Sequence, residues 1–129
     1  MRRFAVVFLI AIGALALNPK SSQAQSLEGA WSGGGQVSFG SGARERARCR
    51  ARYSRRSNEG YVVSAVCATP AGRAAQTASL RKIGDNRYRG TFYNQEYGIS
   101  GTILVIVRGA TQSVRLTSEA GWASLTLSR

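Results

Sequence analysis

The segment Ala43–Tyr53 reads ARERARCRARY, and its alternation decides the fold. Arginine occupies every second position, and from Ala47 onward small or apolar residues fill the positions between the arginines. Because successive side chains of a β-strand point to opposite faces, a strand would collect the arginines on one face and the apolar groups on the other. Arginine, alanine and glutamate also favour helices, but a helix would distribute arginine around its circumference and leave no apolar stripe to bury. We therefore predict a strand.

A second alternating segment, Tyr61–Thr69, follows the first and is expected to pair with it as a hairpin. In that hairpin Cys49 lies across from or diagonal to Cys67. These are the only two cysteines of the sequence, and an even number in a small exported chain indicates a disulfide. Since the sequence has no histidine, the pair offers no zinc site. We expect a Cys49–Cys67 disulfide that joins the two strands.

Short alternating segments continue to the end of the chain, separated by Gly, Asn, Asp and Ser clusters about every 8–12 residues, as in β-sandwiches and barrels. An open sheet of eight or nine strands would leave exposed edges, which closure removes. The sequence therefore predicts an all-β fold, a single small antiparallel up-and-down β-barrel of about eight strands, with a two-sheet β-sandwich as the alternative. The run Gly33–Gly35 is interpreted as a flexible break between two short strands. The segments expected as strands are Leu27–Ser32, Gln36–Phe39, Ala43–Tyr53, Tyr61–Thr69, Gly72–Ile83, Arg87–Tyr93, Tyr97–Arg108, Gln112–Ser118 and Trp122–Arg129.

The N-terminus has the layout of a secretory signal peptide. Two arginines follow Met1, Phe4–Leu17 carries no charge, and small residues precede a cleavage point between Ala24 and Gln25. A retained membrane anchor is the alternative, but a spanning helix needs about 20 apolar residues and this segment is shorter. We expect residues 1–24 to be removed and residues 25–129 to form one periplasmic or secreted domain with no transmembrane span.

The chain is strongly basic, with 18 Lys and Arg against six Asp and Glu and a formal net charge of +12. Removal of the leader takes away Arg2, Arg3 and Lys20, which leaves 15 basic and six acidic residues and a net charge of +9. A charge of this sign favours anionic partners and steers their approach.

The sequence lacks the usual signs of catalysis. With no histidine, His-based triads and imidazole metal sites are impossible, and the six acids are scattered among turns and strand ends. We expect no enzyme activity, no catalytic residue, no metal and no cofactor.

The strongest functional candidate is the row of alternating arginines, which we call the arginine ladder. Arginine's planar guanidinium suits phosphate and carboxylate groups, whereas the alternative is an ordinary solvated face. An export signal argues against nucleic acid as a natural partner, so we expect an anionic envelope lipid or glycan, or an acidic protein. The predicted binding residues are the ladder, Arg44, Arg46, Arg48, Arg50 and Arg52, with Arg55 and Arg56 in the adjoining turn.

A second cluster of aromatic residues begins at Arg87. Tyr88 and Phe92 share one strand parity and are expected in the core. Tyr93 and Tyr97 remain as exposed candidates for a contact surface, because tyrosine offers apolar area with a polar tip.

Gly29-Ala30-Trp31 resembles the Gly-x-Trp of calycin-like barrels, such as lipocalins and avidins, and of small secreted protease inhibitors with a related barrel. The resemblance implies that Trp31 plugs one end of a barrel and that Arg129 or Arg115 lies across it. Over the mature length the chain is similar to small secreted proteins of alphaproteobacteria, which implies a fold and a compartment but no activity. The matching segments are Trp31–Gly33, Cys49–Tyr53, Cys67–Thr69 and Ser100–Ile103.

Three functions are open at this point. The first is a non-enzymatic binding protein that uses the arginine ladder. The second is an inhibitor of a hydrolase, a protease or a lysozyme, suggested by the size, the disulfide and the barrel class. The third is a carrier that holds a small apolar ligand inside the barrel, which requires a cavity.

Overall fold

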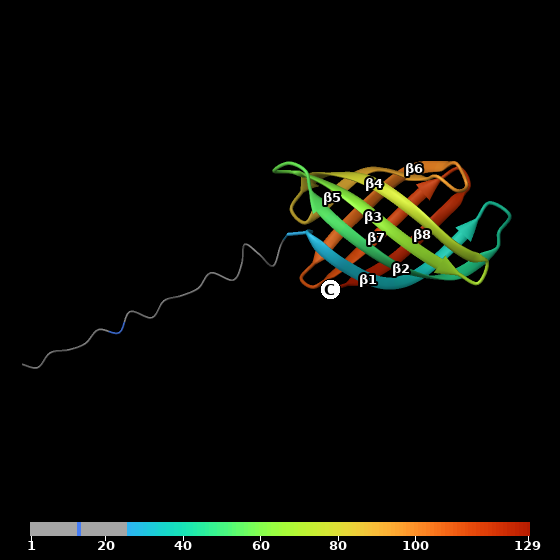
Figure 1. Ribbon diagram of the computed structural model, residues 1–129, viewed down its shortest axis with the longest axis horizontal. Coiled ribbons are helices and arrows are strands. Elements are labelled where there is room, and N and C mark those ends of the chain that lie inside the picture. The colour runs from blue at the N-terminus through green and yellow to red at the C-terminus, as the bar shows by residue number, and fades with distance from the viewer. Residues whose placement is uncertain (1–12, 14–25) are drawn as a thin grey trace, which may run out of the picture.

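The protein, seen here in a computed structural model that describes residues 13 and 26–129, is an eight-stranded antiparallel barrel (Figure 1). The predicted signal peptide lies outside the described residues, apart from Gly13. No described segment forms a helix long and apolar enough to cross a membrane. The strands are β1 (Gly29–Phe39), β2 (Arg44–Arg55), β3 (Gly60–Thr69), β4 (Gly72–Gly84), β5 (Arg87–Asn94), β6 (Ile99–Arg108), β7 (Thr111–Ser118) and β8 (Gly121–Ser128).

Each strand pairs with its neighbours in sequence, and β1 pairs with β8 to close the sheet. Closure leaves no open edge. Side chains alternate between the interior and the outer wall, so the buried residues of every strand fall on one parity. The structure therefore confirms the all-β up-and-down barrel.

The run Gly33–Gly35 is not a break, and this prediction was wrong. β1 is one continuous strand that pairs through the glycines with β2 on one side and β8 on the other. The carbonyl oxygen of Thr126 lies 2.0 Å from where a Cβ on Gly33 would stand, and that of Ser124 lies 1.9 Å from one on Gly35. Glycine is needed here because β8 comes too close for any side chain, which allows the sheet to bend shut.

One strand begins later than expected, because the predicted segment Tyr97–Arg108 contains the end of a turn. The Oδ1 atom of Asn94 accepts a hydrogen bond of 3.1 Å from the backbone N–H of Tyr97. Gly98 adopts a φ of 61°, a left-handed conformation that glycine tolerates. β6 can therefore extend only from Ile99.

The hairpin of β2 and β3 has the register that the cysteines require. Cys49 lies directly opposite Cys67, their Cα atoms are 4.1 Å apart, and the two form a disulfide. This confirms the predicted bridge. On the same inward face, Ala47, Ala51 and Tyr53 are buried in the core.

The core is densest in the half of the barrel that contains the start of β1. Trp31 packs edge-on against Tyr53, with ring centroids 6.3 Å apart. Tyr61 and Tyr88 make a second edge contact at 5.6 Å. Such pairs are favoured by the aromatic quadrupole. These four aromatic residues thus fill one end, whereas Phe39, Tyr97 and Trp122 at the other end stay at least partly exposed.

Candidate functional site

The open end of the barrel, which we call the mouth, holds a cavity of about 450 Å³. The turns that join β1 to β2, β3 to β4, β5 to β6 and β7 to β8 surround it. Its wall is mainly apolar and includes Val37, Cys67, Phe92, Ile99, Leu116 and Ala123, and its rim carries Phe39, Tyr97 and Trp122.

Two carboxamides interrupt the apolar wall of the mouth. Gln76 on β4 and Asn94 on β5 are direct partners in the strand register and both line the cavity. Asn94 is only 6% exposed, although it is polar. Polar groups placed at few points in an apolar pocket are those that orient a ligand.

The opposite end is plugged by Trp31, which is 1% exposed. Its Nε1 donates a hydrogen bond of 2.9 Å to the carbonyl oxygen of Leu27. The guanidinium carbon of Arg129 lies 4.5 Å from the centre of the indole ring, a cation–π contact. Arg115, the other candidate, lies exposed on β7 between Leu104 and Ser124 in the register.

Behind the plug lies a buried polar contact. The hydroxyl of Tyr53 donates a hydrogen bond to Oε1 of Gln112, a residue that is 1% exposed. Burial raises the pKa of Tyr53, because the phenolate would lose its hydration. The pKa of Tyr88 is raised by burial and then by the neighbouring Tyr61, and Arg55 opposes this shift. This end of the core therefore favours the neutral forms of Tyr53 and Tyr88.

The arginine ladder lies on the outer wall of β2, where all five of its side chains are exposed. Within residues 26–129, the side chains of Arg46, Arg48, Arg50 and Arg52 form no hydrogen bond or ion pair with another residue. Arg44 lies over the ring of Trp122 at 5.8 Å. The register sets only uncharged residues beside the ladder, Ala30, Ser32, Gly34, Gln36 and Ser38 on β1 and Ser64, Val66 and Ala68 on β3.

The two remaining predicted arginines lie apart from the ladder, near the plugged end. Arg55 turns to Tyr61, with its guanidinium carbon 5.4 Å from the ring centre and its Nη2 3.0 Å from the hydroxyl. Arg56 begins the exposed turn that joins β2 to β3. The structure thus gathers five of the seven arginines on one surface.

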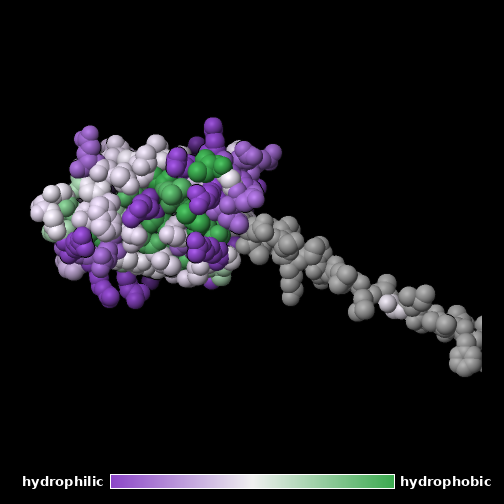
Figure 2. Space-filling view, turned by 180° about the vertical axis from the view of Figure 1, so that it is seen from behind, coloured by the Kyte–Doolittle hydropathy of each residue, from purple (hydrophilic) through white to green (hydrophobic). Residues whose placement is uncertain are grey.

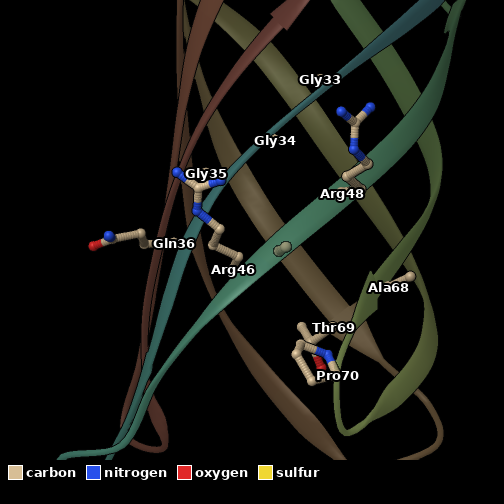
Figure 3. A pocket seen from close by; sticks show the side chains of 10 residues that line it. Gly33, Gly34, Gly35, Gln36, Arg46, Arg48, Ala68, Thr69 and Pro70 are labelled. Carbon is tan, nitrogen blue, oxygen red and sulfur yellow. The ribbon is translucent and has the colours of Figure 1, made fainter.

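A shallow groove of about 610 Å³ runs beside the ladder (Figure 3). The side chains of Arg46 and Arg48 stand on β2 next to the run Gly33–Gly35, and Thr69 and Pro70 close the groove toward the mouth. Because glycines form its floor, the guanidinium groups are not screened by neighbouring side chains. Because the glycines were predicted to break the strand, the groove was not predicted.

The predicted aromatic contacts separate in the structure. Tyr88 and Phe92 are buried, as their parity predicts. Tyr93 is 49% exposed on the outer wall, whereas Tyr97 is 63% exposed and lines the mouth. These two tyrosines do not share a surface patch on one strand face, since Tyr97 belongs to the turn before β6.

The outer wall carries no negative charge at any outward strand position within residues 26–129. Five acids lie in turns or before β1, and Glu45 has the inward parity of β2.

Figure 2 shows a hydrophobic area on the rear wall framed by hydrophilic side chains. On β6, Leu104 and Ile106 face outward but are half-buried, with Arg89 and Arg115 on either side of Leu104. Long arginine stems can cover such apolar surface.

No group of three metal-ligating side chains occurs among the residues that the structure describes.

The mouth residues Gln76 and Asn94 were not predicted from the sequence. A signal for them existed, because a plug at Trp31, near the start of β1, implies that the mouth lies where β1 ends.

The closed sheet, with one plugged and one open end, defines a small up-and-down β-barrel. The redesigned β-barrel mFAP1, solved bound to DFHBI, matches it with a TM-score of 0.70 and 14% sequence identity, over 82% of this chain and 97% of that one. A de novo designed fluorescence-activating β-barrel matches with a TM-score of 0.64 and 17% identity, over 82% of this chain and 95% of the designed one. At these identities the likeness shows the fold alone. No protein-family model and no curated protein sequence matches the chain.

Proposed function

We propose that this protein is an exported, non-enzymatic binding protein that holds a small apolar ligand in the barrel mouth. The observation that carries this proposal is the asymmetry of the barrel, which is filled by Trp31 and tyrosines at one end and hollow at the other. The cavity of about 450 Å³ falls in the range of ligand sites, about 300–1,000 Å³. Its apolar wall would be dehydrated by an apolar occupant, which favours binding.

Two further observations support this function. The barrels mFAP1 and mFAP2b are described as bound to DFHBI, so the same fold accommodates a small molecule in those proteins. The disulfide fits an oxidising compartment, such as the periplasm or the cell exterior, to which the predicted signal peptide would direct the chain.

The test uses phenylnaphthylamine, an uncharged probe that fluoresces when it leaves water. Purified residues 25–129 should enhance its fluorescence in a saturable manner. Ala74 on β4 lines the mouth, and its neighbour Ala75 faces outward. Ala74→Trp should fill the cavity and weaken binding at least tenfold, whereas Ala75→Trp should bind like the wild type. Absence of saturable binding by the wild type, or equal binding by Ala74→Trp, contradicts the proposal.

The arginine ladder supports a second function, the binding of an anionic envelope lipid. The specific observation is that four of its guanidinium groups have no partner within residues 26–129. Like charges on one strand face repel one another, and an anionic surface would relieve that repulsion. Alternate residues of a strand lie about 6.6–6.8 Å apart, so the ladder could meet several headgroups at once.

This second function is tested with vesicles that contain phosphatidylglycerol. The triple substitution of Arg46, Arg48 and Arg50 by Ser removes the centre of the ladder. The triple substitution of Arg81, Arg89 and Arg115 by Ser removes the same charge from the opposite wall and serves as the control. Vesicle binding should fall much further in the first variant and should weaken as salt is added. Equal loss in both variants, or binding indifferent to salt, would refute a specific role of the ladder.

A further inference from the structure

We propose that Gln76 and Asn94 make the mouth selective for a compact, uncharged molecule that carries a hydrogen-bond acceptor, such as a ring ketone. This inference rests on the proposed function, because it names the class of ligand that the mouth takes.

The hydrogen bond of Asn94 fixes which end of its amide is left for a ligand. The backbone N–H of Tyr97 donates to Oδ1 at 3.1 Å, and a donor requires the oxygen at that position. The Nδ2 atom therefore keeps its two N–H donors, and it forms no hydrogen bond with another residue of the described chain. Although Asn94 is only 6% exposed, its Nδ2 is not among the fully buried side-chain atoms that lack a partner, so this donor opens onto the mouth. A ligand acceptor in the cavity would satisfy it.

Gln76 places a second amide beside the first. It is the direct cross-strand partner of Asn94, and such partners have Cβ atoms about 4.5–5.5 Å apart. The side chain of Gln76 also forms no hydrogen bond within the described residues, so its N–H donors are available as well. Two adjacent carboxamides in an apolar wall can grip one carbonyl oxygen, because that oxygen accepts two hydrogen bonds.

The depth of the cavity limits the ligand to a compact shape. Below the mouth, the Cys49–Cys67 disulfide, Phe92 and Leu116 surround a void of only about 40 Å³. A void of that size holds about one water molecule and no part of an extended chain. A long acyl tail would therefore have no channel to enter, whereas a fused ring system fits within the mouth.

The scarcity of charge in the mouth disfavours ionic ligands. Among the described residues, a single charged residue, Arg73, lines the cavity, and its side chain is exposed at the rim. Glu45 shares the inward parity of β2 and lies opposite Val37, which lines the cavity. Glu45 is not itself part of the cavity wall, and a ligand ion of either sign would lose its hydration against that apolar wall.

Three naphthalene probes separate these features. Propionyl-dimethylaminonaphthalene carries a ketone, phenylnaphthylamine carries no carbonyl, and anilinonaphthalene sulfonate adds an anion to the second skeleton. The wild type should bind the ketone tightest and the sulfonate weakest. Gln76→Leu should weaken ketone binding about fivefold, the effect of one lost hydrogen bond, and should leave phenylnaphthylamine within twofold.

A second variant, Asn94→Asp, tests the other amide and keeps the hydrogen bond that holds the turn before β6. The aspartate carboxylate still accepts the hydrogen bond from the Tyr97 N–H, but it has no N–H donors to offer a ligand. The ratio of ketone affinity to phenylnaphthylamine affinity should therefore fall as in Gln76→Leu. If phenylnaphthylamine binds and this ratio is unchanged in both variants, the selectivity is refuted while the proposed function stands. If the wild type binds none of the probes, the proposed function itself fails. Tightest binding of the sulfonate would refute the exclusion of anions.

Discussion

The disulfide offers a quantitative test of the fold. Replacing both Cys49 and Cys67 by alanine opens a loop with a sequence separation of 18 residues. In the chain-entropy treatment, a loop of this length restricts the unfolded chain by about 11 cal/mol/K, or about 3 kcal/mol at 25 °C. Because alanine already occupies neighbouring inward positions of both strands, the substitution itself should disturb packing little.

The change in melting temperature follows from the size of the domain. A domain of residues 26–129 has an unfolding entropy of roughly 0.22 kcal/mol/K. A loss of about 3 kcal/mol should therefore lower the Tm by about 15 °C. Thermal melts followed by far-ultraviolet circular dichroism, on the oxidised wild type and on the double variant, measure this shift directly.

The controls for this prediction use a reductant. Reduced wild type should melt like the double variant, and the double variant should not respond to the reductant. A double variant that melts within about 4 °C of the oxidised wild type would refute the reasoning, since it would mean that the bridge restricts the unfolded chain by under 1 kcal/mol.

Three other predictions concern single residues. Trp31→Ala should cost about 3–5 kcal/mol in urea denaturation, because it empties the plug, and a loss below 1 kcal/mol would show that the plug is dispensable. Gly35→Ala should destabilise the protein by about 1–3 kcal/mol or more, because a Cβ there would lie 1.9 Å from the carbonyl oxygen of Ser124. In the control Gly40→Ala, the added Cβ would lie 3.5 Å from its nearest atom, so this variant should be close to neutral. Because its pKa is raised, Tyr53 stays protonated in the folded protein at pH values where the unfolded chain has released this proton. The free energy of unfolding should therefore fall as the pH rises above about 10, by up to about 1.4 kcal/mol per pH unit. Tyr53→Phe should flatten that loss, as measured by denaturation at pH 9–11.5, and an unchanged slope would contradict it.

The barrel was predictable wherever the strand period is visible in the local sequence. In Ala43–Tyr53 the alternation of arginine with small residues indicates both faces of the strand, and the cysteines define its register with β3. The run Gly33–Gly35 has no such alternation. Its role depends on carbonyl groups of Ser124 and Thr126, about 90 residues later in the chain, whose approach the local sequence cannot show.

The candidate site, like the fold, was predictable only where its residues are neighbours on one strand. The arginine ladder could be found from one segment because its members are neighbours on one strand. Gln76 and Asn94 lie on two strands and meet only through the register of β4 with β5. Their role also depends on which end of the barrel is filled, a property of the packing of Trp31 and the tyrosines rather than of either strand. The binding roles of both surfaces stay predictions until the probes and vesicles are tried.

Both ends of the described chain lie at the plugged end of the barrel, as Figure 1 shows for the start of β1 and the C-terminus. The carbonyl oxygen of Leu27 accepts a hydrogen bond from Trp31, and the guanidinium of Arg129 lies over the indole ring. A linker added after Arg129 would therefore emerge on the side away from the cavity. Molecules anchored to a sensor surface by such a linker would all present their mouths to the solution, so the binding measurements can be made on immobilised protein without blocking the entrance.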